Sequence, residues 1–215
     1  MNGRSLGAAV LDKPRANARV RMPTQDRSRR SLERMLDAAA ALIARNGIES
    51  LTVADVVRRA KSSVGAFYAR FADKDALIRE VQDRFVGQCE DRLSIAVASL
   101  DTPNAGIDTA VEVLIVSIAA VFREHSALIN AFIRQAGRDE VLRRRVDLAF
   151  RRLTSEVGNV LARRFGTPSI AANTFVRIIT ATLEQYVATA EPSRWTDWDT
   201  LVGELQRAGL AYLTR

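Results

Sequence analysis

Cysteine is nearly absent from this 215-residue sequence, and long apolar runs are absent altogether. The single cysteine, Cys89, excludes an intrachain disulfide and predicts a reducing compartment, the cytoplasm. No apolar run approaches the roughly 18 residues that a membrane-spanning helix needs, and the basic N-terminus lacks the apolar segment of a secretory signal. We therefore expect a protein that neither crosses a membrane nor is exported.

The residues of common catalytic sites are also scarce. The only histidine is His125, and neither a G-x-S-x-G motif nor a phosphate-binding glycine loop accompanies it. Cysteine and histidine do not cluster at metal-binding spacing. We expect no catalytic residue, no metal, no cofactor and no enzyme activity. His125 is interpreted as a polar group at a helix end, and Cys89 as a small apolar filler; the alternatives are a ligand contact and a redox-sensing thiol.

The positive charge of the chain is concentrated at its N-terminus. The net charge is +7, and residues 1–30 carry eight Lys or Arg side chains against two Asp. Residues 1–26 also contain two glycines and two prolines and have no apolar stripe, which predicts a basic flexible arm. Such an arm can lie along phosphates or in the minor groove of DNA, and the alternative is a solvated tail.

Beyond residue 26 the chain is predicted to be all-α. Apolar residues recur at helical spacing, and the remaining prolines, Pro103, Pro168 and Pro192, fall where that spacing breaks. We expect about nine helices, at about residues 28–45, 53–60, 64–68, 73–99, 107–124, 126–135, 139–165, 169–190 and 197–213.

Residues 52–74 have the spacing of a helix-turn-helix motif. Thr52 is the predicted N-cap of a first short helix, which ends at Lys61. Ser62 or Ser63 can cap a second short helix that ends near Tyr68. Two helices joined by about three or four residues are typical of a motif whose second helix enters the major groove of DNA.

The same segment resembles the N-terminal domain of tetracycline-repressor (TetR) family regulators over roughly residues 28–80. The residues that agree in order and spacing include Gly47-Ile48, Ser63-Val64-Gly65, Phe67-Tyr68 and Asp73–Leu77. The resemblance implies a DNA-binding domain of three helices at residues 27–75 and a helical effector-binding and dimerisation domain at residues 76–215. The sequence departs from the family at Lys61, where glycine is usual, and at Ser62, where an apolar residue is usual. A lysine at positive φ would cost about 1 kcal/mol.

The predicted recognition helix has few polar side chains, so its specificity must come from few contacts. Val64 and Ala66 can meet thymine methyl groups, and Gly65 permits a close backbone approach. Ser63 can bond base edges or phosphate, and Arg70 is a candidate for a guanine or phosphate contact. The predicted DNA-binding residues are Thr52, Ser62, Ser63, Val64, Gly65, Ala66, Tyr68, Arg70 and Lys74.

Family resemblance supplies the roles of three of these residues. Residues that match Tyr68 and Lys74 usually bind phosphates in the family, and the one that matches Thr52 often does so from a helix N-terminus. Phe67 and Phe71 are expected in the core, because their bulk fits between the small helices.

The last two predicted helices bear on assembly, and the middle helices on ligand binding. Residues 169–190 and 197–213 carry more apolar surface than one core contact needs, which predicts a homodimer with four helices packed across a two-fold axis.

The predicted effector-binding residues are Phe122, Asn130, Phe132 and Tyr186, with ordinary core positions as the alternative.

These observations predict a DNA-binding transcriptional regulator. It would repress transcription by binding a palindromic, double-stranded DNA operator as a homodimer, and a small apolar or amphipathic effector would release it. One alternative is a DNA-organising protein of the same fold that uses no effector. Another is a helical interaction protein that has lost DNA binding, for which Lys61 and Ser62 are the only hints.

Overall fold

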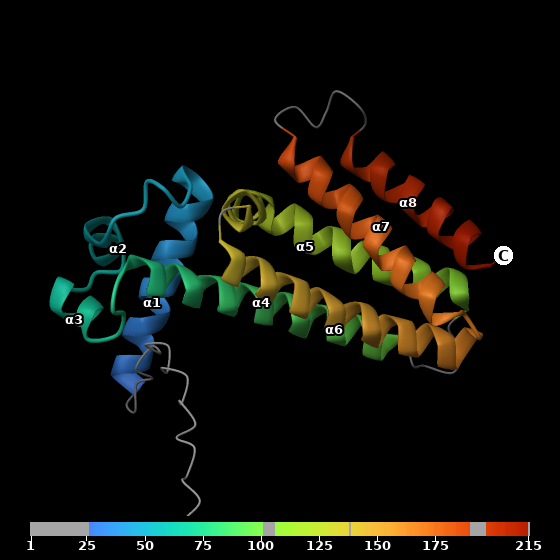
Figure 1. Ribbon diagram of the computed structural model, residues 1–215, viewed down its shortest axis with the longest axis horizontal. Helices are drawn as coiled ribbons and strands as arrows, with labels where there is room; N and C mark the ends of the chain where they lie inside the picture. Colours follow the sequence, from blue (N-terminus) through green and yellow to red (C-terminus); the bar gives the residue numbers. More distant parts are fainter. Residues whose placement is uncertain (1–25, 101–105, 138, 190–196, 215) are drawn as a thin grey trace, which may run out of the picture.

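The computed structural model describes residues 26–100, 106–137, 139–189 and 197–214, and these residues form helices with no strand among them (Figure 1). The all-α prediction is therefore confirmed. Most of the predicted basic arm, residues 1–25, lies outside the described residues. The eight helices are α1 (Asp26–Asn46), α2 (Val53–Arg59), α3 (Val64–Tyr68), α4 (Lys74–Ser99), α5 (Ile107–Ala136), α6 (Glu140–Phe165), α7 (Ser169–Ala188) and α8 (Trp198–Leu213).

Side-chain caps set where the N-terminal helices begin. The side chains of Thr52, Ser63 and Asp73 accept hydrogen bonds from backbone N–H groups three residues further on, at 3.1, 3.1 and 2.7 Å. The predicted caps at Thr52 and Ser63 are confirmed. At the other end of α1, Gly47 has φ +81°, the left-handed conformation that ends helices and that glycine adopts without strain.

The first apolar core joins α1, α2 and α3 to the beginning of α4. Met35 and Ile43 of α1 are fully buried against Val56 of α2, Phe67 of α3 and Leu77 of α4. In Figure 1, α2 and α3 lie on the side of α1 that faces away from the long helices. The two short helices are thus carried on a rigid base and remain at one end of the molecule.

A second core lies among α4, α5, α6, α7 and α8. Ile115 of α5, Leu161 of α6 and Phe175 of α7 are almost completely buried there, and Leu205 and Gly209 of α8 close it. In Figure 1, α7 and α8 run beside each other along the edge of the molecule away from α4. The described part of the chain includes no helix with the length and apolar character that crossing a membrane requires.

The fifth helix corrects one detail of the predicted helix order. Residues 107–124 and 126–135 were expected to form two helices, but both belong to α5, which bends at His125 with φ −115° and ψ 18°. The predicted break is therefore a kink, and the described residues form eight helices instead of about nine. Beyond the kink, Leu128, Ala131 and Phe132 leave the second core and pack into the first.

The two cores give a physical basis for the predicted domain division, which remains a proposal. We propose that residues 27–75 act as the DNA-binding unit and residues 76–215 as the effector and dimerisation unit. Leu77 and Val81 of α4 and Phe132 of α5 belong to the first core although they follow residue 75. The two units would therefore share apolar contacts, so that a movement of α4 or α5 is transmitted to α1.

Candidate DNA-binding surface and ligand cavity

The turn between α2 and α3 is closed by two backbone hydrogen bonds. The Lys61 N–H donates to the Arg58 carbonyl at 3.3 Å, and the Ser62 N–H donates to the Val57 carbonyl at 2.9 Å. This pair of bonds is the Schellman arrangement, in which the residue after the cap takes the left-handed conformation. Lys61 does so, with φ +50°. The turn has the geometry that glycine favours, and the expected strain at Lys61 is present.

Helix α3 exposes one face and buries the other. Phe67 is completely buried, packs against Phe71 with ring centroids 5.1 Å apart, and fixes the helix on the first core. The predicted core positions of both rings are confirmed. On the opposite face Val64 is 50% exposed and Tyr68 is 58% exposed. A side chain added at Gly65 would meet no atom within 4 Å, so this face is open to an approaching partner.

Two of the predicted phosphate contacts lie at helix N-termini beside α3. Thr52 is exposed, and besides capping α2 it donates a hydrogen bond to the Asp55 carboxylate at 2.6 Å. That hydrogen bond, together with the Arg58 guanidinium, holds the pKa of Asp55 below its ordinary value. Lys74 is the first residue of α4 and is half-buried.

Three other predicted contacts have mainly internal roles in this structure. The Arg70 guanidinium donates to the Ala66 carbonyl at 2.7 Å and to the Ser28 hydroxyl at 2.9 Å, so it ties the end of α3 to the start of α1. Ala66 is half-buried against the first core. Ser62 is also half-buried and closes the turn through its N–H. The face directed to solvent is thus formed by Ser63, Val64, Gly65 and Tyr68.

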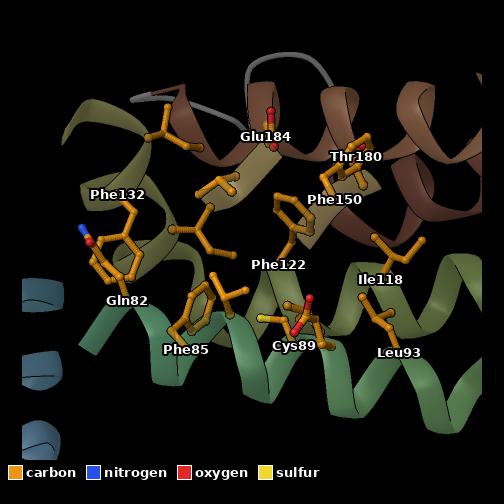
Figure 2. Close-up of a pocket in the computed structure, with 16 residues that line it drawn as sticks. Gln82, Phe85, Cys89, Leu93, Ile118, Phe122, Phe132, Phe150, Thr180 and Glu184 are labelled. Atoms are coloured by element: carbon orange, nitrogen blue, oxygen red, sulfur yellow. The ribbon is translucent and has the colours of Figure 1, made fainter. Parts of the chain in front are cut away.

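A cavity of about 200 Å³ lies between α4, α5, α6 and α7, away from the recognition helix (Figure 2). Most of its wall is apolar, and aromatic rings line it from three of the four helices. Its polar lining residues are Gln82, Cys89, Glu90, Thr180 and Glu184. The apolar lining residues are Phe85, Val86, Leu93, Ile118, Val121, Phe122, Ile129, Phe132, Ile133, Val146 and Phe150.

Two of the four residues predicted to bind an effector line this cavity, namely Phe122 and Phe132. The other two are engaged beside it. The Asn130 amide donates to the Val187 carbonyl at 3.2 Å, and the Tyr186 ring packs edge-on against Trp198 with centroids 5.4 Å apart. Neither is among the described residues that line the cavity.

Sequence reasoning missed the most unusual residue of the cavity, Gln82. Its side chain is 2% exposed, and neither Nε2 nor Oε1 has a hydrogen-bond partner in the structure. The signal was present, because Gln82 lies at helical spacing from Ile78 and Cys89 on the apolar face of α4. Thr180, which also lines the cavity, donates its hydroxyl hydrogen to the Val176 carbonyl at 2.9 Å.

Burial in the cavity disfavours the ionised forms of Cys89 and Glu184. Burial raises the pKa of the Cys89 thiol to about 12, and it also raises the pKa of the Glu184 carboxyl above its ordinary value. The described residues contain no group of three or more His, Cys, Asp or Glu side chains placed to hold a metal ion.

Comparison with known proteins shows a family likeness for the helix-turn-helix segment. The sequence profile of the bacterial regulatory proteins of the tetR family matches residues 35–81, which run from the middle of α1 to the first turns of α4. No curated protein sequence matches. The fold of the whole chain is shared with solved structures of low sequence identity.

Three of these structures illustrate the likeness. A protein from Mesorhizobium loti described as a TetR-family transcriptional regulator is 20% identical, with a TM-score of 0.76 over 88% of this chain and 98% of that one. A transcriptional regulator from Rhodococcus sp. RHA1 is 21% identical, with a TM-score of 0.69 over 86% and 96%. FadR from Bacillus subtilis, solved with stearoyl-CoA, is 15% identical, with a TM-score of 0.66 over 84% and 98%.

The helix-turn-helix with its exposed α3, carried on a larger helical domain, defines a DNA-binding transcriptional regulator. Residues 35–81 match the model of the tetR family of bacterial regulatory proteins, and the whole chain shares the fold of a solved structure described as a TetR-family regulator. The likeness in sequence is confined to the DNA-binding helices, and the likeness of the remaining helices is one of fold.

Proposed function

We propose that this chain represses transcription by binding a palindromic operator as a homodimer, and that an apolar or amphipathic small molecule releases it. The observation that carries the DNA-binding part is the exposed face of α3, with Val64 and Tyr68 half exposed on a helix anchored by the buried Phe67. A short helix held this way can enter a major groove without unfolding. The predicted contacts Ser63 and Gly65 belong to that face, and Thr52 and Lys74 lie at the starts of α2 and α4.

A selection experiment tests whether the chain binds a palindromic operator. The purified full-length chain is mixed with a pool of random DNA duplexes, and the bound sequences are then footprinted. We expect an inverted repeat whose half-sites are separated by about one or more helical turns of roughly 34–36 Å, because two recognition helices related by a two-fold axis demand that spacing. Enrichment of isolated half-sites, or of no sequence at all, would contradict the proposal.

The apolar side chains on the surface of α7 and α8 support the homodimer. Ile170 and Ile178 of α7 and Tyr212 of α8 are exposed in the single chain, and the two helices run together along one edge (Figure 1). A two-fold partner would cover these side chains. We expect Ile178→Glu to give a monomer in sedimentation experiments, and Ile95→Glu on α4, a control that is even more exposed, to leave the dimer intact.

The cavity supports effector-controlled release over the effector-independent alternative. It is lined by four helices, is mostly apolar and holds a buried amide without a partner, which are features of a small-molecule site. The α4 helix that forms one wall also belongs to the first core. A ligand that prefers one position of α4 would therefore change the spacing of the two recognition helices. Such a regulator would act in the cytoplasm, where its operator lies.

A further inference from the structure

The unpartnered amide of Gln82 identifies the polar end of the cavity. Gln82 lies at the end next to α1, beside Phe85 and Phe132, as Figure 2 shows. A buried amide with both its N–H and C=O groups unpaired destabilises a fold, and an apolar residue of similar size would avoid that loss. Its place in the wall of a ligand-sized cavity is explained if a bound molecule supplies the missing partners.

The charge of the lining residues limits what that molecule can be. Glu90 and Glu184 are the charged residues in the described lining, which contains no Lys, Arg or His. No cation therefore lies in the wall to pair with a carboxylate, sulfate or phosphate. Burial raises the pKa of Glu184, so this carboxyl already resists ionisation. An anionic ligand would be buried without a partner and beside two acidic groups.

We infer that the cavity binds an uncharged amphipathic molecule, with an apolar body against the aromatic rings and an amide-like or hydroxyl group bonded to Gln82. A group that both donates and accepts hydrogen bonds satisfies both atoms of the Gln82 amide. The cavity volume of about 200 Å³ suits a short chain or a small ring system. The chain would therefore differ from FadR, which was solved with stearoyl-CoA, a long anionic ligand.

The effector role of this molecule rests on the proposed function. Gln82 lies two residues before Arg84, whose guanidinium lies 3.0 Å from the Glu33 carboxylate and 2.8 Å from the Asp37 carboxylate of α1. A ligand that positions Gln82 thus acts on the helical turn of α4 that is ion-paired to α1.

Two probes of equal chain length test the ligand class by isothermal titration of the full-length protein at pH 8. Octanamide presents an uncharged hydrogen-bonding group, and octanoate presents a negative charge. We expect octanamide to bind at least about tenfold more tightly than octanoate, because only octanamide pairs with Gln82 at no electrostatic cost. Octanoate binding as tightly, or neither probe binding, would overturn the inference.

Three variants locate the interaction. Gln82→Leu should weaken octanamide binding by about tenfold or more, without lowering the melting temperature, since it removes an unpaired buried amide. Gln88→Leu, an exposed position on the same helix, is the matched control and should leave binding unchanged. Glu184→Gln should strengthen octanoate binding and leave octanamide binding unchanged. Octanamide affinity that is insensitive to Gln82→Leu would overturn the assignment of this residue.

Operator release is measured separately, by fluorescence anisotropy of labelled operator DNA. Octanamide that binds in a Gln82-dependent manner and also releases the operator supports the ligand class and the proposed repressor together. Binding that depends on Gln82 without release supports the ligand class, and removes only the effector role from the proposed function.

Discussion

The Arg84 guanidinium of α4 lies 2.8 Å from the Asp37 carboxylate of α1 and 3.0 Å from that of Glu33. This pair of contacts joins the helix that lines the cavity to the helix that carries the DNA-binding motif. Exposed ion pairs of this kind contribute little to folding, but this one restricts how α1 can rotate on α4.

Removal of this bridge, formed by the ion pairs of Arg84 with Asp37 and Glu33, should reduce operator affinity more than the free energy of unfolding. We expect Arg84→Gln to lower operator affinity about two- to five-fold, which corresponds to roughly 0.4–1 kcal/mol, because the recognition helices then sample more orientations. The control is Arg143→Gln, since Arg143 pairs with Glu140 within α6 and joins no two helices. Anisotropy titrations at constant salt measure the affinities. Equal losses in the two variants would exclude a specific role of the bridge.

The exposed face of α3 and the groups beside it should contribute to DNA binding in two ways. Tyr68→Ala and Lys74→Ala are expected to weaken binding to all duplexes, and Lys74→Ala should reduce the salt-dependence slope by about 1, because one phosphate contact is lost. Ser63→Ala and Val64→Ala are expected to change the preference between sequences, because these side chains face the bases. A gel-shift series against operator variants distinguishes the two effects.

The control for the DNA-binding variants is Arg207→Ala on α8, which removes a positive charge far along the chain from α3. It should leave unchanged both the salt dependence of DNA binding and the preference between operator sequences. A uniform loss of affinity in all four α3 and α4 variants would contradict the division into phosphate and base contacts.

The left-handed lysine after α2 gives a stability prediction. Lys61→Gly should raise the free energy of unfolding by about 0.5–1 kcal/mol, because glycine adopts φ +50° without the clash of a Cβ atom. Arg59→Gly, two residues earlier and at the last residue of α2, should lower it by up to about 1 kcal/mol. Urea unfolding followed by circular dichroism measures both. If Lys61→Gly also lowers stability, the strain at this turn is offset by contacts of the lysine side chain.

Two glycines of α8 should respond to alanine in opposite directions. A methyl group at Gly209 would overlap the buried Phe175 ring, so Gly209→Ala should destabilise the protein by about 1–3 kcal/mol. Gly203 has its nearest neighbouring atom, Nη1 of Arg207, at 3.9 Å, so Gly203→Ala should stabilise it by about 0.5–1 kcal/mol. Thermal unfolding of the two variants tests the close packing of α8 on α7. Equal changes of stability in the two variants would refute that packing.

The cavity cysteine should be unreactive in the folded protein. With a pKa of about 12, roughly one Cys89 thiol in ten thousand is ionised at pH 8, and this fraction rises about tenfold for each pH unit. Labelling by iodoacetamide should therefore be slow, increase with pH in that proportion, and accelerate about a thousandfold when the chain is unfolded in urea. Rapid labelling at pH 7 would support the redox-sensing alternative instead of the apolar filler.

Local patterns made much of the fold predictable. The side chains of Thr52 and Ser63 each bond a backbone N–H three residues away, so these two N-caps were identifiable from the sequence. The burial of Phe67 also followed from its apolar bulk, which fits between the small helices. The bend at His125 was visible only as a break in that spacing, since both halves of α5 have helical periodicity. Whether such a break ends a helix or bends it depends on the helices packed around it.

The candidate sites were less predictable for the same reason. Arg70 looked free to bind DNA, but its guanidinium reaches Ser28, 42 residues earlier. Asn130 and Tyr186 were expected in the cavity and instead contact Val187 and Trp198. These partners are chosen by the packing of whole helices, which residue spacing along one helix does not specify.

The amino-acid sequence by itself determined the all-helical class, the helix-turn-helix and its exposed recognition helix, because hydrogen bonds and apolar periodicity over three or four residues decide them. Tertiary structure alone decided which side chains meet across helices: the unpartnered Gln82 in the cavity, the bridge from Arg84 to Asp37, and the fit of Gly209 against Phe175. Those contacts join residues far apart in the chain, and they exist only once the helices have packed into close-fitting cores.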